Sequence, residues 1–357
     1  MLAILQPHIP HYRSSFFNGI LNFYSTKFFT YENSKKTSFQ KFQSSDISST
    51  HLNNFLIDEF LLYNPFPFFN KNYDILVLML HFGHITTWFL LFTKVFHKKK
   101  IILFGHGISV KRYIKEEKSP NILLKLMIQL SDGVWLYTTK EQEIWEKIFP
   151  NKNIVALGNT ISDFNELKLP ELKNKNILRL KYNIRQKTIF IFCARFSNPH
   201  RRTDLLLKAI EVLNRFSFGF IIIGDGPLKP DFSTYRNVYE FGAVYDVEVK
   251  SELFLLADIY FQPAWVGLSI VEALAYGKPV FTFKRSKEVL QCVEYSYIHH
   301  QVNGYIFQNF DEFIQVINNI TDDEVKLMGR NARLFAQKEL NMDVMVRNAV
   351  ESIKSIK

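Results

Sequence analysis

The feature that most constrains the fold is an alternation of short apolar runs with helical stretches, which passes through the chain twice. Near-continuous apolar runs of about four to eight residues are typical of strands that are buried on both faces. In the first half these runs are "LAILQP", "KFFTYE", "DILVLML", "IILFGHG", "GVWLYTT" and "NIVALGNT". The second half restarts with "KTIFIFCARF", "FGFIIIGDGP", "NVYEFGAV", "DIYFQPA" and "KPVFTF". Because strands that alternate with helices form parallel sheets covered by helices, we expect an α/β protein of two doubly wound, Rossmann-like domains.

The length of 357 residues fits this division, since one domain takes about 150 residues. We expect an N-terminal domain over residues 1–165 and a second domain over 166–335, which meet near the polar stretch "NELKLPELKNKN". Residues 336–357 are expected to form a C-terminal helix that packs back toward the first domain. The polar, serine-rich residues 33–50 are expected to be a mobile loop.

Composition and cysteine usage indicate a globular, intracellular protein. Hydrophobic residues make up 47% and charged residues 22% of the chain, which is typical of a folded domain. Cys193 and Cys292 leave no disulfide framework and no zinc spacing, and they indicate a reducing compartment. The first residues lack a basic start and a small-residue cleavage site, so we expect no secretory signal and a cytoplasmic location.

One apolar segment, Ile75–Phe96, is long enough to cross a bilayer, which takes about 20 residues. It contains His81, Gly83, His84 and Lys94, which a membrane span rarely carries. We therefore expect a buried strand, a turn and a helix here instead of a span.

The positive charge is concentrated in the first half of the chain. The formal net charge is +10, and residues 1–160 carry 18 Lys and Arg against 11 Asp and Glu. Such an excess suggests an anionic partner, either a membrane surface, a nucleic acid or a phosphorylated substrate, although a solvated surface explains it equally well. No nucleic-acid motif is present and the aromatic residues are not interleaved with basic ones, so we expect no nucleic-acid partner.

The stretch "PAWVGLSIVEALAYGKPV", Pro263 to Val280, predicts a ligand site. It follows an expected strand, and open α/β sheets bind ligands beyond the carboxyl ends of their strands. Gly267 allows close approach of the backbone, and a helix from about Leu268 would aim its free N–H groups at an anion. Gly277 suits the position that follows this helix.

Glu272 in this helix has two interpretations. Ser269 and Glu272 have the spacing of a capping box, which would only fix the start of the helix. Alternatively, the carboxylate of Glu272 binds the ligand. Cationic groups for an anion would come from "CARFSNPHRRTD", with Arg195 at a strand end and Arg201 and Arg202 before a helix. A salt-bridged surface turn is the alternative for this arginine pair.

In order and spacing, the series "ARF…RRTDLLLKAI…IIIGDGP…VYEFGAV…LFLLADIYFQPAWVGLSIVEALAYGKPV…VNGYIF" resembles glycosyltransferase family 4. The resemblance covers roughly residues 190–310 well, and the first half more loosely through "PHIPHYRSSFFNGI" and "LYTTKEQEIW…IVALGNTIS". It implies the two-domain GT-B fold. It also implies a retaining hexosyltransferase that moves a sugar from a nucleotide diphosphate donor to a saccharide or lipid-linked acceptor.

The resemblance assigns residues to the diphosphate. Arg195 matches the family's phosphate-binding arginine, and Arg201 stands where the family has a lysine, with one extra residue between them. Arg202 is the alternative to Arg201. These cations would stabilise the leaving diphosphate without a metal or another cofactor. The chain has no D-x-D acid pair of the kind that holds a metal in the other main glycosyltransferase fold.

The resemblance also assigns the rest of the donor. The backbone of Gly267 and Leu268, with Ser269 beside them, would meet the phosphates, Glu272 would hold the ribose hydroxyls and Phe241 would lie against the base.

One position departs from the family. Ala264 stands where the first glutamate of the E-x7-E motif, which contacts the donor sugar, should be. The chain therefore resembles a variant branch, and its sugar contacts are in question.

The acceptor is expected to bind the first half of the chain, whose candidate residues lie at or beyond strand ends. They are His8, His11, Arg13 and His81. His84 lies in the same turn as His81. His106 in "LFGHGIS" is the best placed to contact the donor sugar or its phosphate, unless its ring only bonds backbone in a tight turn. A lipid-linked saccharide at the inner membrane face would explain the basic half and the helix that ends in "HKKK".

The sequence thus predicts a glycosyltransferase of surface polysaccharide biosynthesis, peripheral to the membrane. Two alternatives stay open: another GT-B enzyme such as a sugar-nucleotide epimerase, and a non-catalytic protein that binds nucleotide sugars or nucleic acid.

Overall fold

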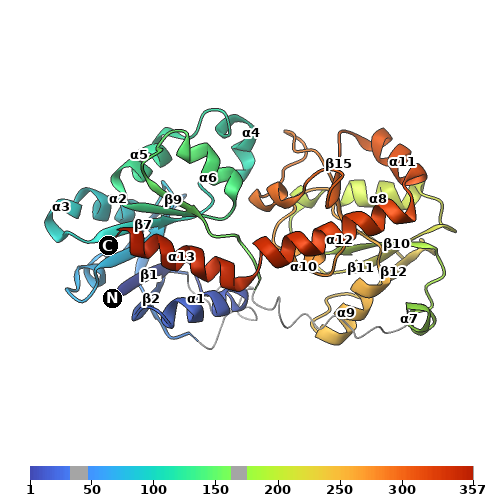
Figure 1. The fold of residues 1–357 in the computed structure, drawn as a ribbon, viewed down its shortest axis with the longest axis horizontal. Helices are drawn as coiled ribbons and strands as arrows, with labels where there is room; N and C mark the ends of the chain where they lie inside the picture. The colour runs from blue at the N-terminus through green and yellow to red at the C-terminus, as the bar shows by residue number, and fades with distance from the viewer. Residues whose placement is uncertain (33–46, 162–174, 357) are drawn as a thin grey trace. The chain divides into compact units, whose positions relative to one another are not determined.

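The computed structural model describes residues 1–32, 47–161 and 175–356. The chain divides into two compact units (Figure 1). Unit 1 comprises Met1–Ser162 together with Asn341–Lys357, and unit 2 comprises Asp163–Leu340. Most of the polar loop 33–50 and most of the linker "NELKLPELKNKN" lie outside the described residues.

Unit 1 is built on a seven-stranded parallel sheet in the order β3-β2-β1-β6-β7-β8-β9. Six of these strands follow the apolar runs of the sequence. Their bounds are Leu2–Gln6 (β1), Thr26–Thr30 (β2), Ser49–His51 (β3), Ile75–Met79 (β6), Lys100–Phe104 (β7), Gly133–Leu136 (β8) and Asn153–Ala156 (β9). Strand β3 was not predicted; it is short and its side chains are exposed, so no apolar run marks it.

Helices cover both faces of this sheet, as the alternating pattern predicts. Helices α1 and α13 pack on one face, and α2, α5 and α6 pack on the other. The helices of unit 1 are Ser14–Leu21 (α1), Ile85–Phe92 (α2), Lys94–His97 (α3), Tyr113–Glu116 (α4), Ile122–Leu130 (α5), Thr139–Glu146 (α6) and Met342–Ile356 (α13). The C-terminal helix α13 therefore belongs to unit 1, where the indole of Trp135 donates a hydrogen bond of 2.9 Å to Ser352.

Unit 1 also holds an antiparallel hairpin that the sequence analysis missed, β4 (Asn54–Ile57) and β5 (Phe60–Tyr63). The segment Ile75–Phe96 forms strand β6, a turn and helix α2, as predicted. Among the described residues, no helix combines the length and the hydrophobicity that crossing a bilayer requires.

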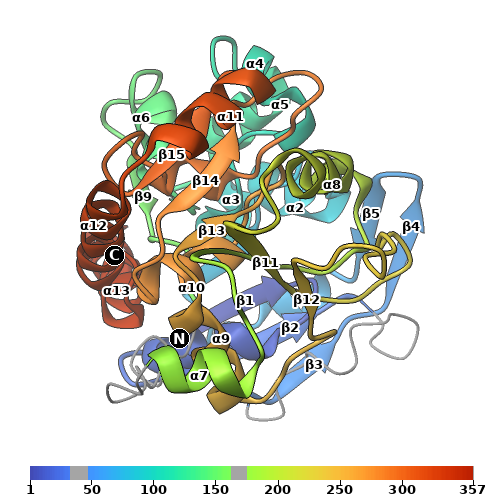
Figure 2. The same cartoon turned by 90° about the vertical axis from the view of Figure 1, so that its right-hand side faces the viewer.

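Unit 2 has a six-stranded parallel sheet in the order β12-β11-β10-β13-β14-β15. The strands are Thr188–Cys193 (β10), Phe218–Ile223 (β11), Val238–Glu240 (β12), Ile259–Phe261 (β13), Val280–Phe283 (β14) and Gly304–Phe307 (β15). Figure 2 shows α8 and α11 on one face of this sheet and α9 and α10 on the other. The helices are Lys175–Lys181 (α7), Thr203–Val212 (α8), Val247–Leu256 (α9), Ser269–Ala275 (α10), Phe310–Asn319 (α11) and Asp322–Glu339 (α12).

The core of unit 2 is rich in phenylalanine. Phenylalanines from five of the strands and from α11 form one buried cluster. Their rings contact each other edge-to-face or stacked, at centroid distances such as 5.0 Å between Phe261 and Phe313. Such ring pairs stabilise a core beyond the area that they bury. The sheet is thus a rigid base for the loops at its carboxyl edge.

Candidate active site

The loops that follow β10, β11, β13 and β14 meet at the carboxyl edge of the unit 2 sheet. Glycine fixes the contact between the first two loops, because Gly224 and Gly226 have φ of +142° and +147°. A Cβ on Gly224 would lie 2.0 Å from the carbonyl oxygen of Ala194, and one on Gly226 would lie 2.6 Å from that of Phe196. These two glycines therefore hold the loop of Arg195 tightly against the "GDG" turn.

Arg201 is the residue of this edge that most strongly indicates a ligand site. It ends a short 3-10 turn, Pro199–Arg201, and no described residue accepts a hydrogen bond from its buried Nε and Nη1 atoms. Burial lowers the pKa of this guanidinium, and the nearby Arg195 lowers it further. Buried donors without partners are rare in folded proteins, so the geometry is that of a cation prepared for an anionic ligand.

Arg202 is engaged elsewhere. Its guanidinium pairs with Asp204, at 2.8 Å from Nε and 2.7 Å from Nη2, and also donates to the carbonyl of Glu288. The hydrogen bond to Asp204 raises the pKa of Arg202. Arg195 is exposed at the end of β10. Of the two arginines that the sequence left as alternatives, the geometry favours Arg201 for an anion, while Arg202 forms the salt-bridged turn.

The loop between β13 and α10 is held by two buried glutamines that the sequence analysis did not single out. Gln262 donates to the carbonyls of Ala264 and Trp265, at 3.1 and 2.7 Å. Gln291 accepts a hydrogen bond of 3.0 Å from the backbone of Val266. Both glutamines are fully buried. A buried side chain that bonds backbone fixes the path of a loop, so this loop is preorganised before any ligand binds.

Glu272 does not form the capping box that its spacing with Ser269 suggested. Helix α10 has no side-chain cap, and the hydroxyl of Ser269 donates to Gln262 instead, at 2.9 Å. The Glu272 carboxylate pairs with Lys250 of α9, at 2.8 Å. Burial alone would lower the pKa of Lys250, but the charge and hydrogen bond of Glu272, together with smaller contributions from Cys193 and Tyr276, outweigh it and the pKa is raised. Lys250 was missed, because a lysine in an ordinary helix gives no signal in the sequence.

The two cysteines lie beside this cluster without the chemistry of nucleophiles. Burial raises the pKa of both Cys193 and Cys292 to about 12, so both are neutral thiols at pH 7. Cys292 lies near Gly267, where an added Cβ would be 3.7 Å from its Sγ atom. Among the residues that the structure describes, no three His, Cys, Asp or Glu side chains are grouped to hold a metal ion.

Phe241 lies at the far side of the same edge. It follows β12, the edge strand of the sheet, and its half-buried ring meets Tyr182 edge-to-face at 5.5 Å. The hydroxyl of Tyr182 donates to Glu252, which also pairs with Lys181. Phe241 is therefore in a position to contact a planar group at the edge of the site.

The candidates in unit 1 are of several kinds. Arg13 is buried, donates to Asn159 at 2.5 Å and lies against the ring of Tyr137 at 5.1 Å, which is the environment of a structural residue. His8 pairs with Glu32 at 2.8 Å. The other three histidines, His11, His81 and His106, are exposed.

The environments of the exposed histidines differ in detail. His106 lies against Tyr137 with a centroid distance of 4.8 Å, and His11 lies edge-on to Tyr12. His81 accepts a hydrogen bond from the backbone of Gly83 at Nδ1, and although the residue as a whole is exposed, the partial burial of its imidazole lowers its pKa. His84, in the same turn, is buried, and burial lowers its pKa to about 3, so it is neutral at pH 7.

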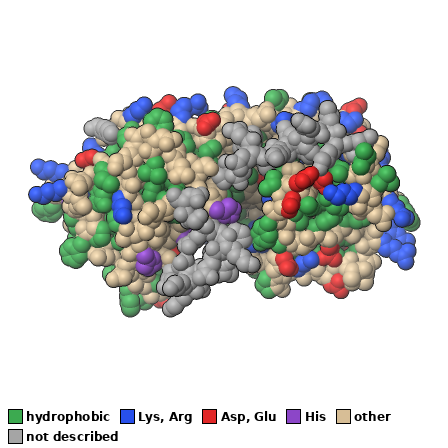
Figure 3. Space-filling view, turned by 90° about the horizontal axis from the view of Figure 1, so that it is seen from below, with side chains coloured by type: hydrophobic (Ala, Val, Ile, Leu, Met, Phe, Trp, Pro, Cys, Tyr) green, Lys and Arg blue, Asp and Glu red, His purple; other side chains and the backbone are tan. Residues whose placement is uncertain are grey.

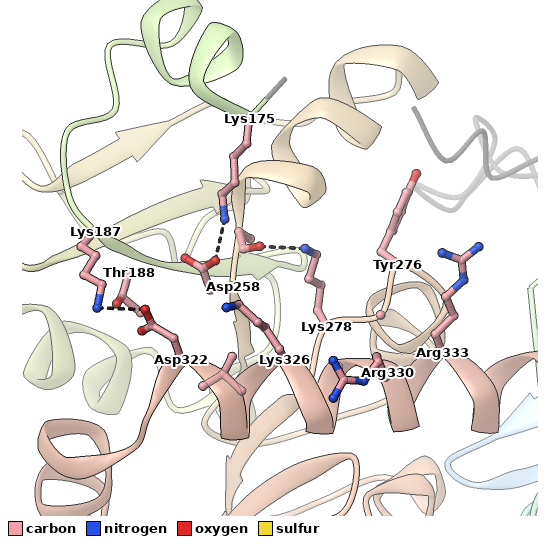
Figure 4. Close-up of a pocket in the computed structure, with 14 residues that line it drawn as sticks. Lys175, Lys187, Thr188, Asp258, Tyr276, Lys278, Asp322, Lys326, Arg330 and Arg333 are labelled. Carbon is pink, nitrogen blue, oxygen red and sulfur yellow. Dashed lines mark hydrogen bonds and ion pairs between the residues drawn. The ribbon is translucent and has the colours of Figure 1, made fainter. Parts of the chain in front are cut away.

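A hollow of unit 2, about 490 Å³ in volume, lies at the opposite, amino edge of the sheet (Figure 4). It is lined by six basic and two acidic side chains. Three of its lysines already bond groups that line the hollow. Lys175 pairs with Asp258, Lys187 pairs with Asp322, and Lys278 donates to the carbonyl of Ala257. Since ligands bind open α/β sheets at the carboxyl edge, the carboxyl edge and not this hollow is the candidate active site.

Comparisons with known proteins bear on the family and the fold of the chain. Residues 187–323 match the family model described as glycosyl transferases group 1. A Haemophilus influenzae protein described as an uncharacterized glycosyltransferase is 23% identical over 244 residues, which cover 65% of this chain and 62% of that protein. The chain thus spans less than two thirds of that relative's length.

Two solved structures share the fold. The structure of Anabaena Alr3699/HepE in complex with UDP has a TM-score of 0.67 at 15% identity, and the match covers 99% of both chains. The apo form of the lipopolysaccharide outer core galactosyltransferase WaaB has a TM-score of 0.67 at 14% identity, and this match also covers 99% of both chains. Residues 187–323 thus carry a domain of the glycosyl transferases group 1 type, and the two α/β units have the fold of GT-B glycosyltransferases.

Proposed function

We propose that the protein is a retaining, metal-independent hexosyltransferase. It takes a sugar from a nucleoside diphosphate sugar and passes it to a saccharide or lipid-linked acceptor in surface polysaccharide biosynthesis. The observation that carries the proposal is Arg201, whose buried Nε and Nη1 have no acceptor among the described residues. The UDP bound to Alr3699/HepE and the activity in the name of WaaB support the class of donor and the pathway.

The chemistry follows from where charge develops. As the bond from the sugar to the diphosphate breaks, negative charge accumulates on the leaving phosphate oxygens. Arg201 and Arg195, together with the backbone of the preorganised loop at Gly267, meet that charge. Donors that are fixed in advance and shielded from water are worth more than the same donors in solution. Glu272, held by Lys250, accepts from the ribose hydroxyls.

The first test is a screen of UDP-, GDP- and ADP-sugars by thermal unfolding. A ligand at about 100 times its dissociation constant stabilises the folded state by about 2.7 kcal/mol. We expect one nucleotide series to raise the melting temperature and the others to have no effect. If no nucleotide sugar stabilises the protein while arbitrary nucleic acid binds it in a salt-dependent way, a nucleic-acid binding protein replaces this proposal.

Turnover separates the remaining alternatives. A transferase releases the nucleoside diphosphate faster when acceptor is added, and the sugar appears on the acceptor. Epimerisation or hydrolysis of the donor without any acceptor identifies a sugar-nucleotide epimerase or a related enzyme. Binding of the donor without release of the diphosphate, across a range of acceptors, identifies a non-catalytic nucleotide-sugar binding protein.

The membrane surface remains the proposed site of action, and helices α2 and α3 are the proposed contact. Ile85, Phe89, Phe92 and Phe96 recur at helical spacing and are all exposed, with Phe96 83% exposed. After His97, Lys98 and Lys100 are exposed, whereas Lys99 is buried and donates to the carbonyls of Asn70 and Tyr73. Figure 3 shows basic side chains beside hydrophobic ones at its left edge, the side on which Figure 1 places α3. An apolar stripe that ends in lysines is typical of helices that lie in an anionic membrane interface.

Replacement of Phe92 and Phe96 by serine together tests this contact. We expect wild-type protein to float with vesicles that contain anionic lipid and to be released by salt, because each lysine near such a surface contributes only about 1 kcal/mol. The double variant should lose most of the binding. Phe216→Ser, at a phenylalanine of unit 2 that is 77% exposed, is the matched control and should float as the wild type does. Equal flotation of all three proteins, or none, argues against the α2–α3 contact.

A further inference from the structure

Trp265 is a strained residue at the centre of the loop between β13 and α10, which we call the donor loop. Its φ is +55°, in the left-handed region that favours glycine. The loop keeps it there with two strong backbone hydrogen bonds: its N–H donates to Leu290 at 2.8 Å, and its carbonyl accepts from Gln262 at 2.7 Å. Strained residues that the surroundings hold in place are concentrated at functional sites. The chain thus retains a bulky residue where glycine would be easier to accommodate.

The loop presents this side chain outward. Ala264 and Val266, on either side, are fully buried, whereas Trp265 is half-buried. Its ring stacks on His200, with a centroid distance of 5.1 Å and an interplanar angle of 24°. No described residue accepts a hydrogen bond from the indole N–H, which leaves that donor available to a ligand. An aromatic platform with a free polar donor suits a ligand that has both an apolar face and hydroxyl groups.

The sheet order shows which part of a donor would reach this platform. Phe241 follows β12 at one edge of the sheet, Arg201 lies in the loop after β10, and Trp265 lies in the loop after β13, the next strand along. A nucleoside diphosphate sugar with its base at Phe241 and its diphosphate at Arg201 has only its sugar left to extend beyond the arginine. His200, which precedes Arg201 in the same turn, joins the platform directly to the phosphate position.

We propose that Trp265, supported by His200, forms the binding subsite for the pyranose ring of the donor sugar. The apolar C–H face of the pyranose packs on the indole, and the indole N–H donates to a ring hydroxyl. Position 264 is a buried alanine, which has no polar group to contact a sugar. In this proposal the Trp265 subsite binds the sugar instead. The inference rests on the proposed function, because it assumes a nucleotide sugar in the site.

The decisive variant is Trp265→Gly, because glycine adopts the backbone conformation without strain and removes the ring. Affinities for UDP and for UDP-glucose are measured by calorimetry on the full chain, with GDP and ADP pairs used if the donor screen selects them. We expect affinity for the nucleotide to stay within about twofold and affinity for the nucleotide sugar to fall by about tenfold, the loss of one good aromatic contact. Trp265→Phe should keep most of the affinity for the nucleotide sugar.

Gln301→Gly is the matched control. Gln301 is an exposed residue of unit 2 with φ of +62°, so the substitution relieves the same kind of strain outside the donor loop. It should leave both affinities unchanged. The sugar subsite is refuted, while the proposed function stands, if Trp265→Gly lowers the affinities for nucleotide and nucleotide sugar equally. The same conclusion follows if the substitution changes neither affinity. If the wild type binds no nucleotide at all, the proposed function fails and the subsite fails with it.

Discussion

Replacing Arg201 by alanine is expected to reduce the initial rate of sugar transfer by about 100- to 1000-fold, the usual cost of losing one preorganised donor to a developing anion. The reason is the two buried guanidinium nitrogens that have no acceptor among the described residues. Arg195→Ala should also reduce the rate, but less, because Arg195 is exposed and water screens its charge. The measurement is the initial rate with the best donor, in buffer with and without EDTA.

Arg202→Ala is the matched control for this prediction. It removes a neighbouring arginine of the same loop, but one whose guanidinium is already paired with Asp204. Because its guanidinium is engaged by Asp204 and by the carbonyl of Glu288, we expect the rate to stay close to that of the wild type. Loss of a partly exposed pair of this kind should lower the stability by at most about 1 kcal/mol. Similar rates for wild type and Arg201→Ala would remove Arg201 from the site. Complete loss of activity in EDTA that magnesium or manganese restores would overturn the metal-independent mechanism.

The fold could be predicted from the sequence because buried parallel strands leave near-continuous apolar runs, and eleven such runs became strands of the two sheets. The elements that were missed lack either a run of this length or the turn residues that would identify a hairpin, and β15 has only three apolar residues in succession. Strand β3 is exposed, and the hairpin β4–β5 is apolar on both faces without the turn residues that mark hairpins. The hairpin turns at Asp58 and Glu59, with φ of +51° at Asp58.

The site was predictable only in part, for a related reason. Arg201 and Glu272 are marked by their place in a spaced series of motifs, whereas the groups that hold the site together are not. Gln291 and Lys250 act through contacts between segments distant in the chain, namely the 3.0 Å bond from the backbone of Val266 to Gln291 and the pair of Lys250 with Glu272. Gln262 bonds residues of its own loop, but no motif marks it. Spacing along one segment also suggested a capping box that the tertiary contacts of Ser269 and Glu272 replace.

The ion pair between Glu272 and Lys250 changes the result expected for Glu272→Gln. From the sequence alone, the substitution should weaken nucleotide binding and leave the fold intact. In the structure it also leaves the ammonium of Lys250, whose side chain is 27% exposed, without its carboxylate partner. We therefore expect the free energy of unfolding to fall by about 1–3 kcal/mol, and the affinity for the nucleoside diphosphate to fall by about 10- to 100-fold through the lost charged acceptor.

The double variant Glu272→Gln with Lys250→Met separates the two effects. Removing both members of a buried pair and filling the space with an apolar side chain is often nearly neutral for stability, whereas removing one is costly. The double variant should therefore recover most of the stability lost in Glu272→Gln, as measured by urea unfolding. Its affinity for the nucleotide should stay low, because the ribose hydroxyls still lack their carboxylate. Recovery of both stability and affinity in the double variant would show that Glu272 serves only to pair α10 with α9. Another residue would then have to bind the ribose hydroxyls.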